Sequence, residues 1–385
     1  MVADWDVIVL GLGGVGSAAI RHLASRGTRV LGLEQYSPAH SHGSSHGQTR
    51  IIRQAYFEHP SYVPLLRRAY QLWEQLERDA HQQLFQRCGL VQMGPDNGEV
   101  IPGVLKSASE YDLSIERLTA QEVSRRWPGI ACDPDCSAVV EKNAGFLRVE
   151  RCVEAHLRLA EHEGAECRFG VAAKAWKVDG TGVSVATSEG RYRASRLVIA
   201  GGAWSVGLLR SLETRLQVLR KHLYWFATGS HRVALEDGFP CFFHETPTGF
   251  YYGFPSIDSR GLKVARHSGG EPIAGPDSTP GTVELDEEDF AMVEDYVIRY
   301  VPGVRTRLSD RTGCYYTNTP DEHFVVDQHP QYPQVTVVAG LSGHGFKFTS
   351  VLGEIACQLA LGQSPEQDIS LFRLDRPAIR GGSRG

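Results

Sequence analysis

The stretch Asp6-Val-Ile-Val-Leu-Gly11-Leu-Gly13-Gly-Val-Gly16 lies at the start of the chain and decides the fold. Residues 7–10 are a continuous apolar run rich in β-branched side chains, which is typical of a strand buried on both faces of a parallel sheet. The three numbered glycines have the spacing that makes a tight turn, exposes backbone N–H groups to a pyrophosphate and lets the next helix pack closely. The stretch therefore predicts a strand, a turn and a helix that bind a dinucleotide.

The residues that follow complete a βαβ unit. Apolar side chains at helical spacing continue to Gly27, a residue type that often ends a helix, and residues 30–33 form a second apolar run. Glu34 comes directly after this run, at roughly the 20-residue spacing from the glycines where a carboxylate accepts the ribose hydroxyls. An acid at this position argues against NADP, whereas NAD and FAD both stay open on this motif.

The composition is ordinary for a soluble globular protein. Hydrophobic residues make up 42% and charged residues 22% of the 385 residues, a length that predicts two domains or one large domain with insertions. The net charge of −5 gives no reason to expect nucleic acid or an anionic membrane as a partner, and no apolar run has a membrane-spanning length. A first strand so close to the start leaves no room for a secretory signal, and the eight cysteines contain no CxxC pair. We expect a cytoplasmic protein with reduced thiols and no metal site.

Helix and strand patterns alternate in an order that predicts two interleaved domains. The first and last buried strands, residues 7–10 and 335–339, are of the parallel type, and strand-rich segments lie between them. We therefore expect an α/β fold, in which a Rossmann-like dinucleotide-binding domain is interleaved with an α+β substrate domain built on an antiparallel sheet. The first domain is assigned residues 1–85, 145–215 and 305–385, and the second residues 86–144 and 216–304.

Two further segments carry donors and cations suited to an anion or an electron-rich ring. In residues 42–53, two arginines three positions apart follow glycine, serine and threonine residues. Residues 340–347 form a glycine-rich connection between a strand and a helix, which directs N–H groups toward negative charge. Taken alone, the first segment could be a solvated basic turn and the second an ordinary connection. In the same way, His267 could be structural and Cys314 a small buried apolar residue.

Together these residues resemble the monomeric sarcosine oxidase family and its relatives, N-methyltryptophan oxidase and peroxisomal sarcosine/pipecolate oxidase. The resemblance runs from residue 6 to residue 377. It is most specific in four segments: His46-Gly-Gln-Thr-Arg50-Ile-Ile-Arg53, Tyr251-Tyr-Gly-Phe-Pro255, Cys314-Tyr-Tyr-Thr-Asn-Thr-Pro-Asp-Glu322 and Ser342-Gly-His-Gly-Phe-Lys347. It implies that the dinucleotide is FAD, joined through the flavin 8α-methyl group to the sulfur of Cys314.

The resemblance also implies roles for individual side chains. Arg50 would lie against the flavin, Arg53 and Lys347 would hold a substrate carboxylate, and Lys263 would activate oxygen. His267, Tyr252 and Tyr316 would line the substrate pocket and take part in catalysis. The residues expected to hold the cofactor are Gly11, Gly13, Gly16, Glu34, Ser44, His46, Thr49, Arg50, Trp204, Cys314, Gly343, Gly345 and Lys347.

Two residues depart from the family pattern. Gln48 replaces an aspartate common in bacterial sarcosine oxidases, and Phe243 stands where a methionine lines the sarcosine pocket. The resemblance implies a monomer that uses O₂ to oxidise a secondary amino acid. The simplest case is demethylation of sarcosine or another N-methyl amino acid, with formaldehyde and H₂O₂ as products. The alternatives are an oxidase of L-pipecolate or another cyclic imino acid, an N-methyltryptophan oxidase, an NAD-dependent dehydrogenase and a non-catalytic flavoprotein sensor.

Overall fold

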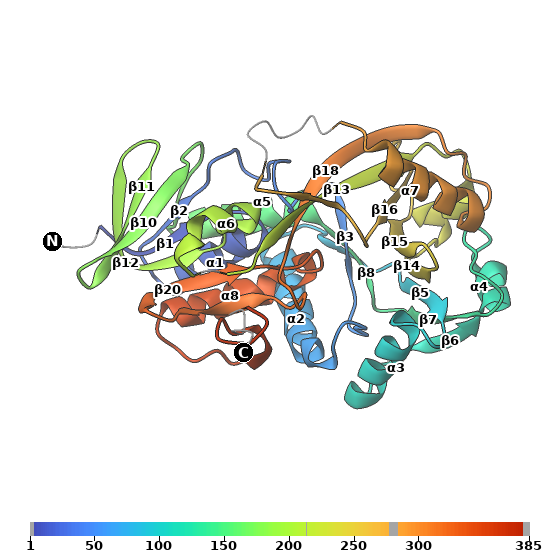
Figure 1. Ribbon diagram of the computed structural model, residues 1–385, viewed down its shortest axis with the longest axis horizontal. Helices are drawn as coiled ribbons and strands as arrows, with labels where there is room; N and C mark the ends of the chain where they lie inside the picture. Colours follow the sequence, from blue (N-terminus) through green and yellow to red (C-terminus); the bar gives the residue numbers. More distant parts are fainter. Residues whose placement is uncertain (1–3, 213, 277–283, 380–385) are drawn as a thin grey trace, which may run out of the picture.

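The computed structural model describes residues 4–212, 214–276 and 284–379, arranged around two large sheets (Figure 1). Sheet A, at the left of Figure 1, contains the N-terminal strand, and sheet C, at the right, contains strands from the middle of the chain. A small third sheet of β3 (Thr49–Ile52), β4 (Phe85–Gln86) and β8 (Gly145–Arg148) lies between them. Among the described residues, no helix combines the length and apolar character that a membrane span requires.

Sheet A has a parallel centre with antiparallel additions. Its order is β10-β11-β12-β1-β2-β9, with β20 beside β12 and β19 beside β20. The parallel strands are β1 (Trp5–Leu10), β2 (Val30–Leu33), β9 (Glu166–Arg168), β12 (Arg191–Ile199) and β20 (Tyr332–Ala339). The antiparallel strands are β10 (Ala173–Asp179), β11 (Gly182–Thr187) and β19 (Val325–His329).

Helices from three distant parts of the chain pack beside sheet A. Helix α1 (Gly14–Ala24) contacts both α5 (Val149–His162) and α8 (Thr349–Ala360), and α2 (Val63–Ala80) contacts α8. The α1–α8 crossing is close because Gly353 has no side chain: a Cβ there would lie 2.4 Å from the Cβ of Ala18. The expected α/β fold with a Rossmann-like nucleotide-binding part is confirmed.

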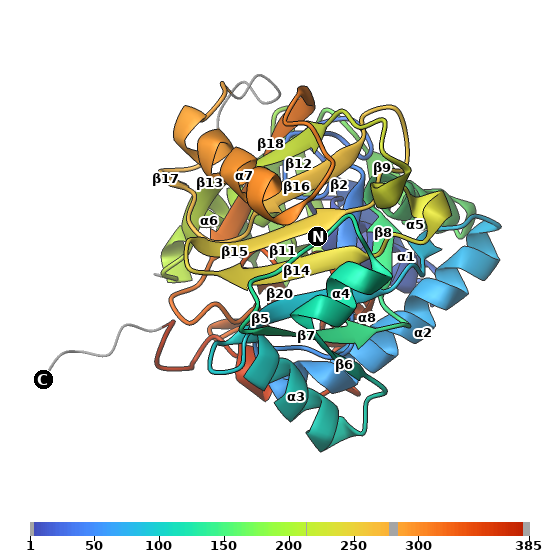
Figure 2. The same cartoon turned by 90° about the vertical axis from the view of Figure 1, so that its right-hand side faces the viewer.

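Sheet C is antiparallel except where β14 pairs with β5. Its order is β17-β13-β16-β15-β14-β5-β7-β6, and β18 pairs with β13. Figure 2 faces this sheet, with α7 toward the top and α3 toward the bottom. The strands are β5 (Leu90–Pro95), β6 (Glu116–Thr119), β7 (Cys136–Glu141), β13 (Gln217–Phe226), β14 (Cys241–Thr246), β15 (Gly249–Phe254), β16 (Leu262–Arg266), β17 (Glu271–Ile273) and β18 (Leu308–Asn318). The helices beside it are α3 (Val100–Tyr111), α4 (Ala120–Arg126) and α7 (Glu287–Tyr300).

Short helical turns complete the described structure. They comprise α6 (Ser205–Leu208) and the 3₁₀ turns η1 (Pro60–Tyr62), η2 (Gly202–Trp204), η3 (Arg210–Leu212), η4 (His231–Val233), η5 (Leu235–Asp237), η6 (Phe346–Phe348) and η7 (Ser370–Phe372).

The domain boundaries given above stay a prediction, and sheet membership differs from them at one strand. Residues 308–318 were assigned to the first domain, yet β18 pairs along its length with β13 of sheet C. The pattern of a single strand reports which faces are buried, but not which sheet supplies its hydrogen-bond partner. This strand carries Cys314 and Tyr316, so its place in sheet C decides where those side chains lie.

The tight turn after β1 depends on Gly16. A Cβ at this position would lie 1.7 Å from the carbonyl oxygen of Gly11, so the turn and α1 must separate to accept a side chain. We predict that Gly16→Ala lowers the free energy of unfolding by about 3 kcal/mol or more, at the upper end of overpacking effects. Urea denaturation measures this loss. The matched control is Gly229→Ala, because Gly229 is exposed and a Cβ there meets no atom within 4 Å. Equal losses in both variants would contradict the prediction.

Candidate active site

A cavity of about 470 Å³ has walls from both large sheets. The glycine turn after β1, Glu34 and the segment after β12 contribute from the side of sheet A. Side chains of β14, β15 and β18 contribute from the side of sheet C. The cavity therefore lies at the carboxyl ends of parallel strands, where α/β folds bind their ligands.

The sheet A side of the cavity has the geometry expected of a cradle for a dinucleotide. Gly11 has φ +84°, and a Cβ there would lie 2.7 Å from the carbonyl oxygen of Ala200. Glu34 is buried, and each of its carboxylate oxygens accepts one backbone N–H, from Leu12 at 2.9 Å and from Tyr36 at 3.1 Å. A carboxylate has about four acceptor sites, so Glu34 keeps capacity for ligand hydroxyls. The N-terminus of α1 adds positive potential for phosphates.

The loop before β3 is tied to β18 beside Cys314. The hydroxyl of Ser44 donates to the carbonyl oxygen of Tyr315 at 2.5 Å, and Nη2 of Arg50 donates to the carbonyl oxygen of Ser44 at 2.9 Å. Nη1 of Arg50 donates to the carbonyl oxygen of Thr49, also at 2.9 Å. These bonds hold the guanidinium of Arg50 at the cavity wall.

The peptide segment 47–49 lies between a carboxylate and an ammonium group. Gly47 and Gln48 both have positive φ, +83° and +75°, so their N–H groups converge, and both donate to Oε1 of Glu150, at 2.7 and 3.0 Å. On the carbonyl side, Nζ of Lys263 donates to the carbonyl oxygens of Gly47 and Thr49 at 2.6 and 3.0 Å and to the Thr49 hydroxyl at 3.2 Å. The three donors of Lys263 are thus all used.

Lys263 is buried and lies behind the cavity wall rather than in it. Burial lowers its pKa well below the usual value for lysine, and the positive charge of Arg50 adds to this effect. Burial, with Arg50 next and then Lys263, also lowers the pKa of His46 to about 3. Four predicted residues do not line the cavity: Gly16, His46, Thr49 and Lys263.

Arg53 is buried and paired with an acid that the sequence did not single out. Its Nη2 lies 2.8 Å from both carboxylate oxygens of Glu58, and its guanidinium lies over the rings of Tyr56 and Phe57, 4.6 and 4.9 Å from their centres. Burial alone would raise the pKa of Glu58, but Arg53 and other nearby cations lower it to about 2. Within the described part of the chain, Nε of Arg53 has no hydrogen-bond partner.

Lys347 adds a second buried cation beside Arg53. Its Nζ donates to the carbonyl oxygen of His344 at 2.7 Å and lies 5.2 Å from the ring centre of Tyr56. Burial lowers the pKa of Lys347 well below its usual value, and Arg53 contributes to this shift. Nε2 of His344 must donate to the carbonyl oxygen of Glu322, 3.0 Å away, so Nδ1 accepts from the Tyr56 hydroxyl at 2.5 Å.

Aromatic side chains form the cavity wall next to these cations. The Tyr316 hydroxyl and Nδ1 of His267 are 3.2 Å apart, and the rings of Phe243 and His267 are 5.7 Å apart. Burial, together with nearby Lys221, lowers the pKa of His267 to about 3, so the imidazole is neutral near pH 7. Burial also raises the pKa of Tyr252 to about 12, although Arg50 opposes this shift.

Cys314 lines the cavity as a buried thiol. Burial raises its pKa, and the charges of Arg50, Lys221 and Lys263 oppose that rise. Gly343 lies against the ring of Tyr316, with φ +77° and no room for a Cβ, which would lie 2.3 Å from that ring. The predicted residues that line the cavity are Gly11, Gly13, Glu34, Ser44, Arg50, Arg53, Trp204, Tyr252, His267, Cys314, Tyr316, Gly343, Gly345 and Lys347.

Three residues near the cavity were missed from the sequence. Glu58 and Glu150 are acids whose partners become visible only in three dimensions, although a buried cation at Arg53 requires a partner of some kind. Lys221 is buried, and its Nζ donates to the carbonyl oxygens of residues 267, 268 and 269, at 3.3, 2.8 and 3.0 Å. It therefore fixes the backbone of His267.

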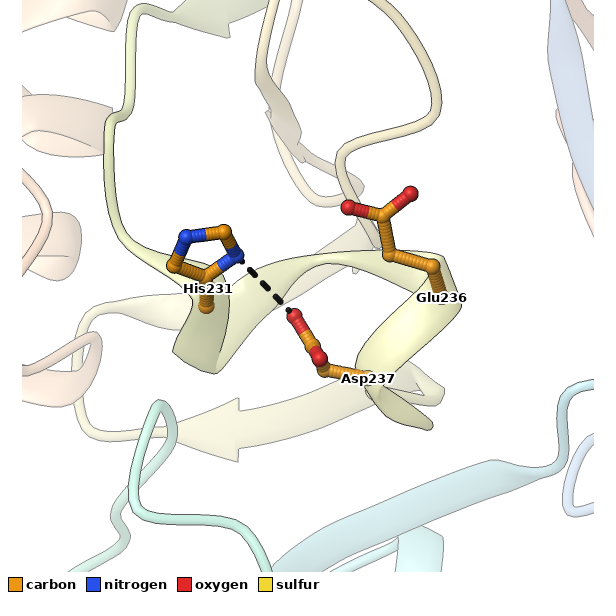
Figure 3. Close-up of side chains that lie close together, drawn as sticks. All are labelled: His231, Glu236 and Asp237. Carbon is orange, nitrogen blue, oxygen red and sulfur yellow. Dashed lines mark ion pairs between the residues drawn. The ribbon is translucent and has the colours of Figure 1, made fainter.

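A separate cluster of possible metal ligands lies on the surface (Figure 3). His231, Glu236 and Asp237 bring their ligand atoms within 4.8 Å of one another, and Nδ1 of His231 lies 3.4 Å from Oδ2 of Asp237. All three side chains are exposed. An exposed ion pair with a neighbouring acid is common on protein surfaces, so the cluster by itself does not indicate a metal site.

Comparisons with known proteins agree with this geometry. The model of the FAD dependent oxidoreductase (DAO) family matches residues 6–359. The chain is 44% identical to a monomeric sarcosine oxidase of Streptomyces avermitilis, over 97% of both chains. It is 37% identical to an N-methyl-L-tryptophan oxidase of Citrobacter koseri, over 97% of this chain and 99% of that one.

The fold also matches a solved structure. NikD, described as an unusual amino acid oxidase essential for nikkomycin biosynthesis, superimposes with a TM-score of 0.84 and 24% identity over 97% of this chain and 98% of that one. The family model, the full-length relatives and the glycine cradle lead to one assignment: the chain is an FAD-dependent oxidoreductase and belongs with the monomeric sarcosine oxidases and N-methyl-L-tryptophan oxidases.

Proposed function

We propose that the protein oxidises a small secondary amino acid at the cavity described above. The simplest reaction is demethylation of sarcosine or another N-methyl amino acid to the amino acid, formaldehyde and H₂O₂. The observation that carries the proposal is the placement of Arg53 and Lys347, two buried cations with unused donors, on the same cavity as Cys314. The names of the relatives, which refer to sarcosine and N-methyl-L-tryptophan, support the same class of substrate.

The residues present fit FAD. The cradle of Gly11 and Gly13 admits a pyrophosphate, Glu34 can accept ribose hydroxyls, and the Cys314 thiol can hold the flavin ring through an 8α-thioether. When bound, FAD supplies the acceptor for the two electrons of amine oxidation and passes them on to O₂. An NAD-dependent dehydrogenase would have no use for the thiol in this wall.

Arg53 and Lys347 would bind the substrate carboxylate. Nη2 of Arg53 is occupied by Glu58, but its Nε has no hydrogen-bond partner among the described residues. Lys347 uses one of its three N–H donors on the carbonyl oxygen of His344. A carboxylate placed here would accept from both cations and raise the pKa of Lys347 toward its usual value. It would also share Arg53 with Glu58.

The aromatic wall would keep the substrate amine neutral. Tyr252, Tyr316 and Phe243 offer little hydration to an ammonium group, so the neutral amine that gives up electrons is favoured. His267, with a pKa of about 3, is a weak proton acceptor at pH 7. We therefore propose that His267 orients Tyr316 and the substrate, and that it does not remove a proton.

Lys263 would act on oxygen through its charge. Its N–H groups are all donated to residues 47–49, so it cannot bind a reacting atom directly without giving up one of these bonds. A unit positive charge about 4 Å from developing negative charge contributes roughly 4 kcal/mol at an effective dielectric constant of about 20. Such a contribution corresponds to a rate factor of about 10³.

A phenylalanine cluster beside Arg53 favours a second class of substrate. The ring of Phe243 lies 5.1 Å from Phe57 and 6.0 Å from Phe250, centre to centre. Phe243 is the member of this cluster that lines the cavity. Its ring would pack against the ring of L-pipecolate or another cyclic imino acid, or against the side chain of an N-methyl aromatic amino acid, but sarcosine has no group to reach it. Peroxide release from a panel of N-methyl and cyclic amino acids distinguishes these substrates.

We predict that the flavin is covalently attached to Cys314. Acid precipitation of wild-type protein should leave the yellow colour in the pellet, whereas Cys314→Ala protein should release its flavin to the supernatant. The control is Cys357→Ala, because Cys357 is equally buried but lies in α8 and does not line the cavity. Release of flavin from wild type to the same extent as from Cys314→Ala would exclude this attachment.

We predict that Arg53 and Lys347 bind the substrate carboxylate. Lys347→Met, and Arg53→Gln combined with Glu58→Gln to avoid an unpaired buried acid, should each weaken the binding of unreactive carboxylates such as propionate by roughly 1.5–3 kcal/mol. Titration of the flavin absorbance measures the dissociation constants. Lys174→Met is the matched control, since Lys174 lines the cavity but is exposed. Unchanged constants in both test variants would remove these residues from the site.

We predict that Lys263 serves reoxidation by O₂ more than oxidation of the substrate. In Lys263→Met, reoxidation should slow by up to about 10³-fold, while anaerobic reduction by substrate should change less. Stopped-flow measurement of each half-reaction separates the two effects. Lys221→Met is the control, because Lys221 is also buried among three carbonyl oxygens but holds the backbone of His267. Equal losses of both rates in Lys263→Met would mean that Lys263 only supports the wall.

A further inference from the structure

The eight cysteines differ in exposure and surroundings. Four are buried, at 152, 241, 314 and 357, and four are partly exposed, at 88, 132, 136 and 167. In the part of the chain that the structure describes, one pair of thiols is in contact: the sulfurs of Cys88 and Cys241 lie 3.7 Å apart. One member of this pair reaches solvent and the other does not.

The backbone keeps these two thiols side by side. Cys88 lies between β4 and β5, and Cys241 is the first residue of β14, which pairs in parallel with β5. The backbone N–H of Cys241 donates to the carbonyl oxygen of Gly89 at 3.1 Å, directly after Cys88. The sulfurs are already at van der Waals separation, so closing them to the length of a disulfide, about 2 Å, needs side-chain rotation and a small shift of the chain.

Cys88 also differs in acidity from the other partly exposed cysteines. A hydrogen bond from the Cys241 thiol lowers the pKa of Cys88, although partial burial opposes the shift. Burial and nearby carboxylates raise the pKa of Cys132 to about 12 and that of Cys136 to about 11, and the pKa of Cys167 rises to about 12. Since the thiolate is the reactive form, Cys88 should react first among the thiols that solvent reaches.

We propose that Cys88 and Cys241 form a peroxide-reactive dithiol site, in which Cys88 is oxidised by H₂O₂ and Cys241 then closes a reversible disulfide. In the first step, the Cys88 thiolate attacks one oxygen of H₂O₂. The O–O bond breaks, Cys88 becomes a sulfenic acid, and the released hydroxide takes up the proton that the thiol had lost. In the second step, the Cys241 sulfur displaces hydroxide from the Cys88 sulfur, and its own proton leaves with that hydroxide as water. Two thiols lose two electrons, and one H₂O₂ gains them.

The location gives this chemistry a use. Cys241 packs in the same cluster of buried side chains as Phe243, Tyr252, Cys314 and Tyr316, which line the cavity. Peroxide formed by the reaction proposed above would be produced in this cavity, and a single thiol that it oxidised at Cys88 would progress to irreversible sulfinic acid. A neighbouring thiol that closes a disulfide stops this progress.

The experiment supplies H₂O₂ from outside, so its outcome does not depend on the proposed substrate. Flavin-containing protein is treated with a small molar excess of H₂O₂, its remaining thiols are alkylated, and its peptides are analysed by mass spectrometry. We expect the Cys88 and Cys241 peptides to be joined, with a mass two hydrogen atoms below their sum, and dithiothreitol to separate them. Cys132, Cys136 and Cys167 should remain alkylated in the same sample.

Two variants test the order of the steps. In Cys241→Ala, Cys88 should accumulate sulfenic and then sulfinic acid. In Cys88→Ser, which changes a partly exposed side chain, Cys241 should stay reduced in folded protein. The proposal would be overturned if Cys132, Cys136 or Cys167 were oxidised as fast as Cys88. It would also fail if wild-type Cys88 were oxidised without a link to Cys241, or if Cys241 were oxidised equally in Cys88→Ser.

Discussion

The structure around the cavity depends on how it holds buried positive charge. Among the cationic side chains near the cavity, five are withdrawn from solvent, four of them fully and Arg50 in part, and this is costly unless polar groups replace the lost water. Four of them are held by backbone carbonyl oxygens and one by a carboxylate: Arg50, Lys221, Lys263 and Lys347 in the first case, Arg53 in the second. Carbonyl dipoles fix the position of a cation without cancelling its charge. Burial lowers the pKa of the three lysines, so these carbonyl contacts, and any anionic ligand placed beside them, stabilise the charged form of the side chains against that effect.

The same arrangement joins the two large sheets. Lys263 comes from β16 of sheet C, Glu150 comes from α5 beside sheet A, and residues 47–49 lie between them. The N–H groups of this segment donate to Glu150, and its carbonyl oxygens accept from Lys263. The peptide groups thus relay an attraction between two opposite charges that do not touch. This explains why a loop with two consecutive positive φ angles is kept in place.

Local sequence patterns were sufficient to predict the nucleotide-binding part of the fold. Features that depend on contacts between residues distant in the sequence could not be predicted in this way. The glycine turn, α1, β2 and Glu34 form one continuous segment whose geometry follows from spacing, and the family resemblance supplied Arg53, Cys314 and Lys347. The pairing of the strand at 308–318 with β13 of sheet C could not be predicted, because β13 is distant in the sequence. The roles of Glu58 and Glu150 could not be predicted from the sequence, because an acid in a polar segment is expected to be solvent-exposed until its partner is known. For the same reason, the position of Lys263 behind the wall could not be read from strand alternation alone.

The departure at Gln48 can be understood from the same charge arrangement. Where the resemblance leads one to expect an aspartate, the amide donates through Nε2 to Oδ2 of Asp258 at 2.5 Å and accepts from Nε1 of Trp225 at 3.2 Å. The loop therefore still contacts a carboxylate, but this carboxylate belongs to Asp258, which also pairs with Arg260. Negative charge moves away from Lys263 while both hydrogen-bonding ends of the side chain stay satisfied. The substitution thus leaves the loop anchored, and it makes the surroundings of Lys263 more positive than a carboxylate at position 48 would.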